Sequence, residues 1–346
     1  QCNWTVETSI DQYVKNTLEK NFELFEKYPD YRFNFEGAIK YKFAKEYYPE
    51  LYDKLKGYIS SGQWNISGGS VDANDVMVPS AESIIRNFLY GQEYYKKEFG
   101  VKVGSDIMLP DCFGFPYSLP TLVSHGGVTG FHSAKLGWGS AYDLNSLPNF
   151  GVWRGVDGSE IFAVYKPGAY DTESKYRKNL AYDSDILSEI NSNNSNYGVA
   201  SSFRYVGNVG DRGGAVADET ADWLTKSAAN DGPVKVKLAT PTEFFNSITP
   251  AEKSTLHVWD NELPMETHGV GCYSSQTILK YWNRRNELLA DATEKTSVLA
   301  HWLGGLPYQS EPIRNSWTNV LWHQFHDDLP GTSLPQAYNF TYNDHI

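Results

Sequence analysis

The sequence has little positive charge and no long apolar run. Its 30 Lys and Arg residues are outnumbered by 42 Asp and Glu residues, which gives a formal net charge of −12. Nucleic-acid affinity comes largely from basic side chains that neutralise phosphates, so this balance argues against nucleic acid as a partner. No stretch approaches about 18 consecutive apolar residues, and no membrane span is therefore expected.

Cysteine is also scarce. The chain has three, at positions 2, 112 and 272. An odd number this small does not predict a disulfide framework, and it does not indicate a cellular compartment. Cys112 has no neighbouring His, Asn or glycine turn of the kind that activates a thiol, so we expect it to be a small buried residue.

Aromatic residues, by contrast, are abundant. They make up 15% of the 346 residues, within a hydrophobic content of 40% that is typical of a globular protein. Aromatic rings often stack on the flat C–H faces of sugars, although most rings in any protein fill its core. The composition is therefore compatible with a carbohydrate-binding protein but does not establish one.

Predicted strands and helices alternate over about the first 240 residues. Apolar periodicity predicts helices around 10–28, 44–63, 81–99 and from 119, and strands around 31–38, 64–69, 105–109 and 127–134. Pro49 should break the second helix, and the third should begin after Ser80 and end at Gly100. Such alternation predicts an α/β fold with a parallel sheet, either a barrel or an open doubly wound sheet. Both keep their reactive groups at the C-terminal ends of the strands.

The second half of the chain has a different pattern. Residues 183–235 are rich in Asn, Ser, Gly and Asp and are predicted to be mostly loop. Two long helical patterns follow, over 274–304 and 312–328. We therefore expect a first domain over residues 1–265 and a mainly helical second domain over residues 266–346.

Asp111 directly follows the apolar run Ile107–Leu109 and Pro110. A carboxylate in this position is either a helix cap or a reactive group held at a strand end. Because α/β folds gather their chemistry at strand ends, we favour the second interpretation.

The motif HQFHDD, residues 323–328, ends the last helical pattern. Two His residues three positions apart can share one helix face, and imidazole and carboxylate groups are ligands that zinc accepts. Taken alone the signal is weak, because a His near a helix C-terminus is also favoured by the helix dipole.

Two further acids are candidates. Asp211 lies among four glycines in GNVGDRGGAV, where a ligand can approach the backbone closely, although Asp in a glycine turn is also ordinary turn chemistry. Asp75 either helps to begin the helix that follows Pro79 or points at a ligand.

Taken together, these segments resemble the family 38 glycoside hydrolases, which are retaining α-mannosidases. The resemblance covers nearly the whole chain. It is carried by the segments MLPDCFGFPYSLPTL, GFHSAKLGWGSAY, GVWRGVDGSEI, GDRGGA, METHGVGCYSSQ, WNRRNELLADA and LWHQFHDDLPGTS, in this order.

The resemblance implies a seven-stranded (β/α) barrel-like catalytic domain, followed by a three-helix middle domain. It also implies one zinc ion, with Asp111 as both nucleophile and ligand, His326 as a second ligand and Asp327 close to the metal or the sugar. Asp211 would be the general acid/base. Asp75, Lys135 and Trp138 would line the substrate pocket, and the substrates would be mannose-containing oligosaccharides or glycoconjugates.

The sequence departs from the family at its ends. The family has two more zinc ligands in a His-x-Asp motif near its N-terminus, and Gln1 aligns after that motif, with Cys2 in place of a family tryptophan. Ile346 precedes the C-terminal β-rich region of the family. The resemblance thus implies a fragment that carries two of four zinc ligands.

Two alternatives remain open. A relative that binds mannose or glycans without turnover would fit the incomplete zinc shell. A different zinc hydrolase on a related barrel, such as a polysaccharide deacetylase, would need a paired His motif. His125 and His132 do not supply such a pair, because they lie on different predicted elements.

Overall fold

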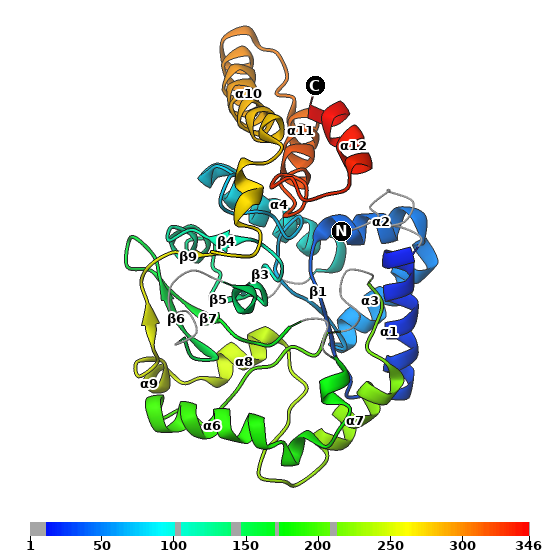
Figure 1. Ribbon diagram of the computed structural model, residues 1–346. Helices are drawn as coiled ribbons and strands as arrows, with labels where there is room; N and C mark the ends of the chain where they lie inside the picture. Colours follow the sequence, from blue (N-terminus) through cyan, green and yellow to red (C-terminus); the bar gives the residue numbers. More distant parts are fainter. Residues whose placement is uncertain (1–11, 101–104, 140–146, 170–172, 208–212, 346) are drawn as a thin grey trace.

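The computed structural model describes residues 12–100, 105–139, 147–169, 173–207 and 213–345 (Figure 1). Its N-terminal part alternates helices with short strands, as the sequence predicts. The elements are α1 (Lys15–Lys27), β1 (Phe33–Phe35), α2 (Ala38–Tyr47), α3 (Pro49–Ser61), β2 (Trp64–Ile66) and α4 (Ala81–Phe99).

The ends of these helices have local causes. Pro49 is the first residue of α3, where its missing N–H costs no hydrogen bond, and it separates α3 from α2. The hydroxyl of Ser80 accepts a hydrogen bond from the N–H of Ser83 and caps α4, and Gly100 closes α4 in a left-handed conformation. Both boundaries confirm the sequence prediction.

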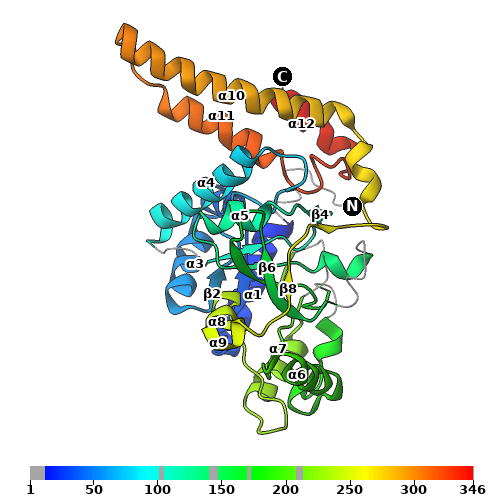
Figure 2. The same cartoon turned by 90° about the vertical axis from the view of Figure 1, so that its left-hand side faces the viewer.

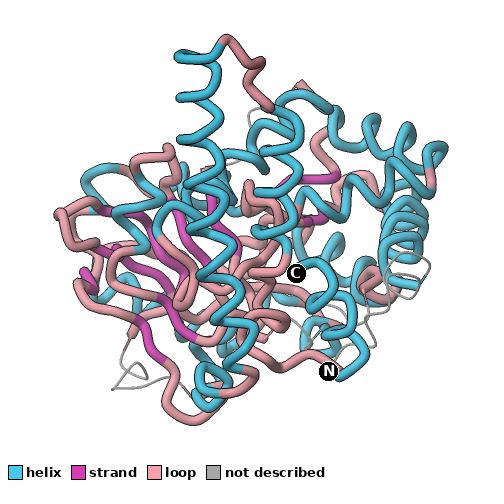
Figure 3. Tube along the Cα trace, turned by 90° about the horizontal axis from the view of Figure 1, so that it is seen from above, coloured by secondary structure: helices cyan, strands magenta, loops and turns pink. Residues whose placement is uncertain are grey.

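The main sheet has five strands in the order β3-β5-β7-β6-β8. The strands and helices of this region are β3 (Asp106–Met108), β4 (Gly114–Phe115), α5 (Leu119–Ser124), β5 (Gly130–His132), β6 (Phe150–Arg154), β7 (Glu160–Val164), β8 (Val258–Trp259) and β9 (Leu263–Pro264). Two pairs, β1-β2 and β4-β9, form separate sheets. In Figure 3 the β1-β2 pair lies apart from the strands of the main sheet.

The prediction of a purely parallel sheet is wrong in one place. β6 and β7 pair antiparallel, whereas β3, β5 and β7 are parallel neighbours. The reason is a tight turn between β6 and β7, closed by a hydrogen bond from the N–H of Gly155 to the carbonyl of Ser159, with Gly158 at φ +84°. Asp157-Gly158 is a hairpin signal in the sequence.

The described strands do not join into a closed barrel. The β1-β2 pair and the five-stranded sheet share no backbone ladder within the described residues. What the structure has here is a mixed α/β arrangement, in which the segments after β1, β2 and β3 each contribute to the wall of one cavity.

Residues 183–235 are more helical than predicted. The 3-10 helix η5 (Leu180–Tyr182) precedes them, and they contain α6 (Ser184–Tyr197) and α7 (Asp218–Ala228). The helices α8 (Pro241–Ser247) and α9 (Pro250–Lys253) follow. The carboxylate of Asp183 accepts hydrogen bonds from the N–H groups of Asp185 and Ile186, which caps α6. This cap stabilises a helix that its Asn and Ser content disfavours.

The C-terminal part consists of helices. They are η6 (Val270–Ser274), α10 (Thr277–Gly304), α11 (Ser310–Trp322) and α12 (Pro335–His345). Figure 2 shows α10 and α11 side by side, extending past the body of the protein. Within the described residues, no helix has the length and apolar character needed to cross a membrane.

A buried carboxylate links these helices to the first part of the chain. Glu287 of α10 is buried, and its Oε1 accepts hydrogen bonds from the N–H of Ser80, the hydroxyl of Ser83 and the amide of Gln324. These bonds join α10 to the start of α4 and to the segment after α11. The C-terminal helices are therefore fixed on α4 by polar as well as apolar contacts.

Candidate functional site

Asp111 lies at the C-terminal end of β3, where strand-end chemistry is expected. Pro110 precedes it, and β4 begins three residues later at Gly114, whose φ of 130° favours glycine. β4 is itself fixed by antiparallel pairing with β9. The carboxylate is thus held between two paired strands, and it does not cap a helix.

Lys135 provides the first partner of this carboxylate. It begins the 3-10 helix η2 (Lys135–Trp138), is 3% exposed, and its ammonium group donates a hydrogen bond to Oδ1 of Asp111. The ammonium nitrogen lies 4.5 Å from the ring centre of Trp138 and 5.1 Å from that of Phe113. Two aromatic faces therefore help to hold this buried cation.

His326 provides the second partner. Its Nε2 lies 3.4 Å from Oδ2 of Asp111, and its Nδ1 is 2.8 Å from the carbonyl oxygen of Ala73. A carbonyl only accepts hydrogen bonds, so Nδ1 carries a proton and Nε2 faces Asp111. A backbone bond of this type commonly orients an imidazole for work at its other nitrogen.

The HQFHDD motif is not helical, which corrects the expectation of one shared helix face. α11 ends at Trp322, and the chain then forms a bridge with residues 73–75. The N–H of Asp75 donates to the carbonyl of Gln324, and the N–H of His326 donates to that of Ala73. These bonds to a distant segment take the place of bonds within a helix. As a result, the imidazoles of His323 and His326 contact different partners.

His323 consequently does not join Asp111. Its Nδ1 is 2.7 Å from the carboxylate of Asp328, and its Nε2 is 3.0 Å from that of Asp344 on α12. The side chain therefore ties α12 to the motif.

The electrostatics of the Asp111 group follow from these contacts. Burial disfavours the ionised carboxylate, but the hydrogen bond and charge of His326 and the charge of Lys135 outweigh it and hold the pKa of Asp111 well below its usual range. For His326, burial favours the neutral ring, but bonding to Asp111 and the charge of Asp327 raise its pKa to about 9. Asp111 is therefore ionised at neutral pH.

Asp111, His326 and Asp327 share the wall of a cavity of about 370 Å³. Asp327 is held in place by Thr332, whose hydroxyl donates to its carboxylate over 2.7 Å. The cavity is largely lined by apolar and aromatic side chains. Its wall includes Tyr13, Val14, Phe35, Ile39, Phe43, Met108, Gly213, Trp322, Phe325 and Phe340.

Sequence reasoning missed three charged residues in this wall. The ammonium of Lys40 on α2 pairs with Glu36, directly after β1, and with Asp72, at 2.8 Å. Burial raises the pKa of Glu36. The sequence signal that could have identified Glu36 is its position after a predicted strand, because Asp111 also follows a strand.

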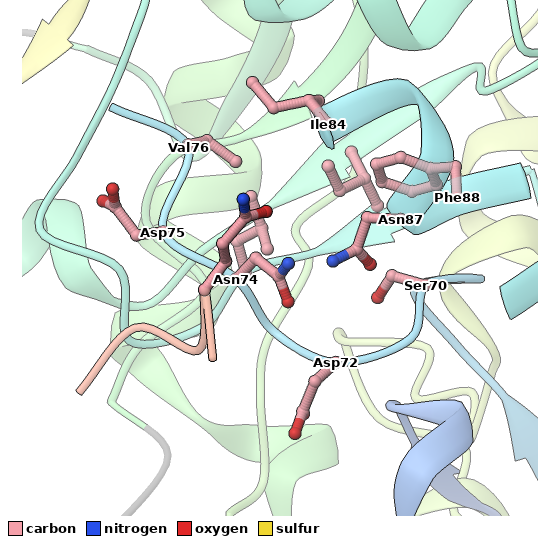
Figure 4. A pocket seen from close by; sticks show the side chains of 11 residues that line it. Ser70, Asp72, Asn74, Asp75, Val76, Ile84, Asn87 and Phe88 are labelled. Carbon is pink, nitrogen blue, oxygen red and sulfur yellow. The ribbon is translucent and has the colours of Figure 1, made fainter. Parts of the chain in front are cut away.

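Asp75, Lys135 and Trp138 lie close to the site but are not among the residues that line the cavity. Asp75 is fully buried, and its carboxylate accepts hydrogen bonds from the hydroxyl of Tyr273 and the N–H of Val78. Figure 4 shows Asp72 and Asp75 projecting from the same loop in different directions. Trp138 packs beside His268, with ring centres 5.2 Å apart, and against the Lys135 ammonium.

Asp211, the predicted acid/base, lies outside the described residues. Cys112 is buried, as expected, and its thiol donates to the carbonyl of Asn74. Within the described part of the chain, no three or more His, Cys, Asp or Glu side chains are grouped closely enough to hold a metal ion by themselves.

Comparison with known proteins adds to this geometry. Residues 3–262 match the model of the glycosyl hydrolases family 38 N-terminal domain, and residues 266–346 match the alpha mannosidase middle domain. The chain belongs to glycosyl hydrolase family 38.

Curated relatives of this family 38 chain include three α-mannosidases. It is 36% identical over 313 residues to alpha-mannosidase G of Dictyostelium discoideum, covering 90% of this chain and 27% of the relative. It is 32% identical to an alpha-mannosidase of Saccharomyces cerevisiae, covering 92% and 29%. It is 29% identical to human alpha-mannosidase 2C1, covering 90% and 29%. The chain thus spans less than a third of the length of these relatives.

Solved structures show a similar fold. An alpha-mannosidase from Enterococcus faecalis has a TM-score of 0.76 at 15% identity, over 99% of this chain and 39% of that one. A 4-alpha-glucanotransferase from Thermococcus litoralis has a TM-score of 0.61 at 11% identity, over 97% and 54%. At these identities the likeness concerns the fold of the family 38 chain.

Proposed function

We propose that this chain contains the catalytic part of a retaining, zinc-dependent α-mannosidase that acts on mannose-containing glycans. The observation that carries the proposal is the convergence of Asp111, Lys135 and His326 at the end of β3, in a chain that belongs to family 38. The curated relatives named above are α-mannosidases.

In the proposed mechanism, Asp111 is the nucleophile. Its low pKa keeps it ionised, so that it can attack the anomeric carbon and form a glycosyl–enzyme ester. Asp211 protonates the leaving oxygen and then takes a proton from the water that cleaves the ester. Gly213, two residues after Asp211 in the chain, lines the same cavity as Asp111, which supports this assignment.

The donor types and the spacing of Asp111 and His326 support a zinc ion at this site. Two ligand atoms at about 2.0–2.1 Å from a tetrahedral zinc ion are about 3.3–3.4 Å apart, and Nε2 of His326 is 3.4 Å from Oδ2 of Asp111. We propose these two atoms as ligands, with Asp327 beside them; zinc would take the place of the proton that the hydrogen bond to Asp111 favours on Nε2 of His326. When bound, zinc would supply Lewis-acid contacts to sugar hydroxyl groups. Lys135 orients the other oxygen of Asp111.

We also propose that the β1-β2 pair and the strands of the main sheet belong to one barrel-like wall. We further propose residues 1–265 as the catalytic domain and residues 266–346 as the middle domain. Hydrogen bonds from Ser67 and Gly68, directly after β2, to the Asp106 carboxylate on β3 support the first part. The matched ranges 3–262 and 266–346 support the second.

The test uses the complete protein with an aryl α-mannoside. We expect hydrolysis with retained anomeric configuration by NMR, and covalent labelling of Asp111 by an activated fluoro-mannosyl fluoride, located by peptide mass spectrometry. Asp111→Asn should lower kcat by roughly a thousandfold or more, whereas Asp291→Asn, on the exposed face of α10, should leave it unchanged. A label elsewhere or an inverted product would refute the mechanism, and mannose binding without turnover would favour a binding protein.

A further inference from the structure

A second buried polar cluster lies beneath the Asp111 site and takes no part in the mechanism above. Nε2 of His132 on β5 is 2.9 Å from Oδ2 of Asp106 on β3, and its Nδ1 bonds to the hydroxyl of Tyr205. The same Asp106 oxygen accepts hydrogen bonds from the Ser67 hydroxyl and, at 3.1 Å, from the N–H of Gly68. We call Asp106, His132 and Tyr205 the clasp.

The donors and acceptors of the clasp are set by chemistry. A carboxylate only accepts, so the bonded Nε2 of His132 carries a proton, and in the neutral ring Nδ1 accepts from the Tyr205 hydroxyl. Burial and the nearby Asp106 raise the pKa of Tyr205 far above its usual value, so its hydroxyl keeps its proton. The hydroxyl of Tyr205 therefore donates to His132, and His132 donates to the carboxylate of Asp106.

Stability alone is a poor explanation for the clasp. Asp106 and His132 are both fully buried, and burying such groups costs free energy unless every partner is in place. Among the described residues, Oδ1 of Asp106 has no hydrogen-bond partner. Apolar side chains would fill the same space at lower cost, which favours a role in fixing geometry.

The position of the clasp indicates which geometry it fixes. It joins the end of β2 to β3 across the gap where the described strands have no backbone ladder. It also joins β3 to β5 by side chains in addition to backbone pairing. Tyr205 is anchored in turn by a 2.7 Å bond from its N–H to the carbonyl of Pro167, just after β7.

The register of β3 and β5 leads directly to the active-site ion pair. Met108 of β3 is opposite His132 of β5. Asp111 and Lys135 each follow three residues after that pair, on their own strands. A register slip of one residue would shift one partner by about 3.3 Å, which is enough to break a hydrogen bond.

We propose that Asp106, His132 and Tyr205 are positioning residues that hold Asp111 and Lys135 in register for attack on the sugar. This rests on the proposed function, because it concerns the reactivity of the same Asp111. None of the three residues lines the cavity, so their effect is transmitted through β3 and β5.

The experiment compares variants of the complete protein. His132→Leu removes both bonds of the ring, and Tyr205→Phe removes one hydroxyl. His132→Gln keeps a side-chain N–H near the position of Nε2, which bonds to Asp106. We expect kcat to fall roughly ten- to hundredfold in His132→Leu, since misplacement by about 1 Å can cost this much, and less in Tyr205→Phe, with KM changing little. His132→Gln should recover part of the loss, which a packing role would not predict.

The matched control is His125→Leu. His125 also bonds an aspartate, with Nε2 3.0 Å from the carboxylate of Asp157, but on the surface. It should retain the kcat of the unmodified protein. Activities are referred to the folded fraction measured by near-UV circular dichroism, and if His132→Leu does not fold, Tyr205→Phe and His132→Gln carry the test.

A readout independent of turnover separates this inference from the proposed function. Amide hydrogen exchange at residues 109–113 and 132–138 should accelerate in Tyr205→Phe and His132→Leu but not in His125→Leu. If the complete protein does not hydrolyse mannosides, the proposed function fails and hydrogen exchange still decides the role of the clasp. Unchanged exchange together with unchanged kcat would overturn it.

Discussion

Nε2 of His326 lies 3.4 Å from Oδ2 of Asp111, although one residue follows β3 and the other follows α11 near the C-terminus. Nδ1 of the same imidazole is fixed by the carbonyl of Ala73. One nitrogen of the ring is therefore bonded to the backbone, and the other faces the carboxylate of Asp111. Removing it should change metal binding more than folding.

We expect His326→Ala to reduce zinc content and activity together. The complete protein should bind about one zinc ion by mass spectrometry of the metal, and the variant much less, because losing one ligand weakens a small zinc site severely. A chelator should abolish hydrolysis, and added zinc should restore it. His301→Ala, at an exposed position on α10, serves as the control. Full activity in a zinc-free preparation would contradict the proposal.

Lys135→Met should raise the pKa of Asp111. The ammonium is one of the groups that hold this pKa low, so without it the carboxylate ionises at higher pH. The acidic limb of the kcat/KM profile should therefore move to higher pH, with a loss of roughly tenfold or more at neutral pH. Lys226→Met, which removes an exposed pair with Asp222, should leave the profile unchanged. An unshifted acidic limb would argue against this role.

His323 should make stability depend on pH. Burial favours its neutral form, but hydrogen bonds and charges of Asp328 and Asp344 outweigh it and raise its pKa above 6.5. The stabilisation is thus fully present below about 6.5 and is lost as pH rises through the raised pKa. In His323→Gln, the unfolding midpoint should fall less between pH 6 and pH 9 than in the unmodified protein. Parallel pH curves for the two proteins would exclude this contribution.

Two glycines on helices should respond in opposite ways to alanine. A Cβ at Gly91 of α4 would lie 2.4 Å from the carbonyl carbon of Ser70 and 2.5 Å from the carbonyl oxygen of Gly69, and neither backbone atom can move aside easily. Gly91→Ala should therefore lower the free energy of unfolding, by about 1–3 kcal/mol. A Cβ at Gly57 of α3 meets nothing within 4 Å, so Gly57→Ala should raise it by about 0.8–1.0 kcal/mol. Urea unfolding of both variants measures these changes, and equal signs would contradict the packing.

Glu287→Ala should weaken the attachment of the C-terminal helices. It removes the acceptor for the N–H of Ser80, the hydroxyl of Ser83 and the amide of Gln324, all near a buried position. The free energy of unfolding should therefore fall, because each buried donor left without a partner costs about 1–3 kcal/mol at most. Glu311→Ala, exposed on α11, is the matched control. Urea midpoints that do not differ between the two variants would rule out this link.

The sequence by itself determined much of the local structure. Pro49, Ser80 and Gly100 set helix boundaries through backbone chemistry that acts within a few residues, and the predicted boundaries agree with those observed. The motifs around Asp111 and His326 also identified the family correctly, because they are local patterns. Patterns of this kind need no knowledge of distant contacts.

Only the tertiary structure decided how distant residues meet. Spacing alone grouped His323 with His326 on one helix face, but hydrogen bonds to Ala73 and Asp75 unwind that segment and separate the two rings. The pairing of Asp111 with Lys135, the cluster around Lys40 and the clasp likewise join residues from different segments of the chain. Strand order and register bring them together, and these depend on packing across the whole chain, which no local pattern encodes.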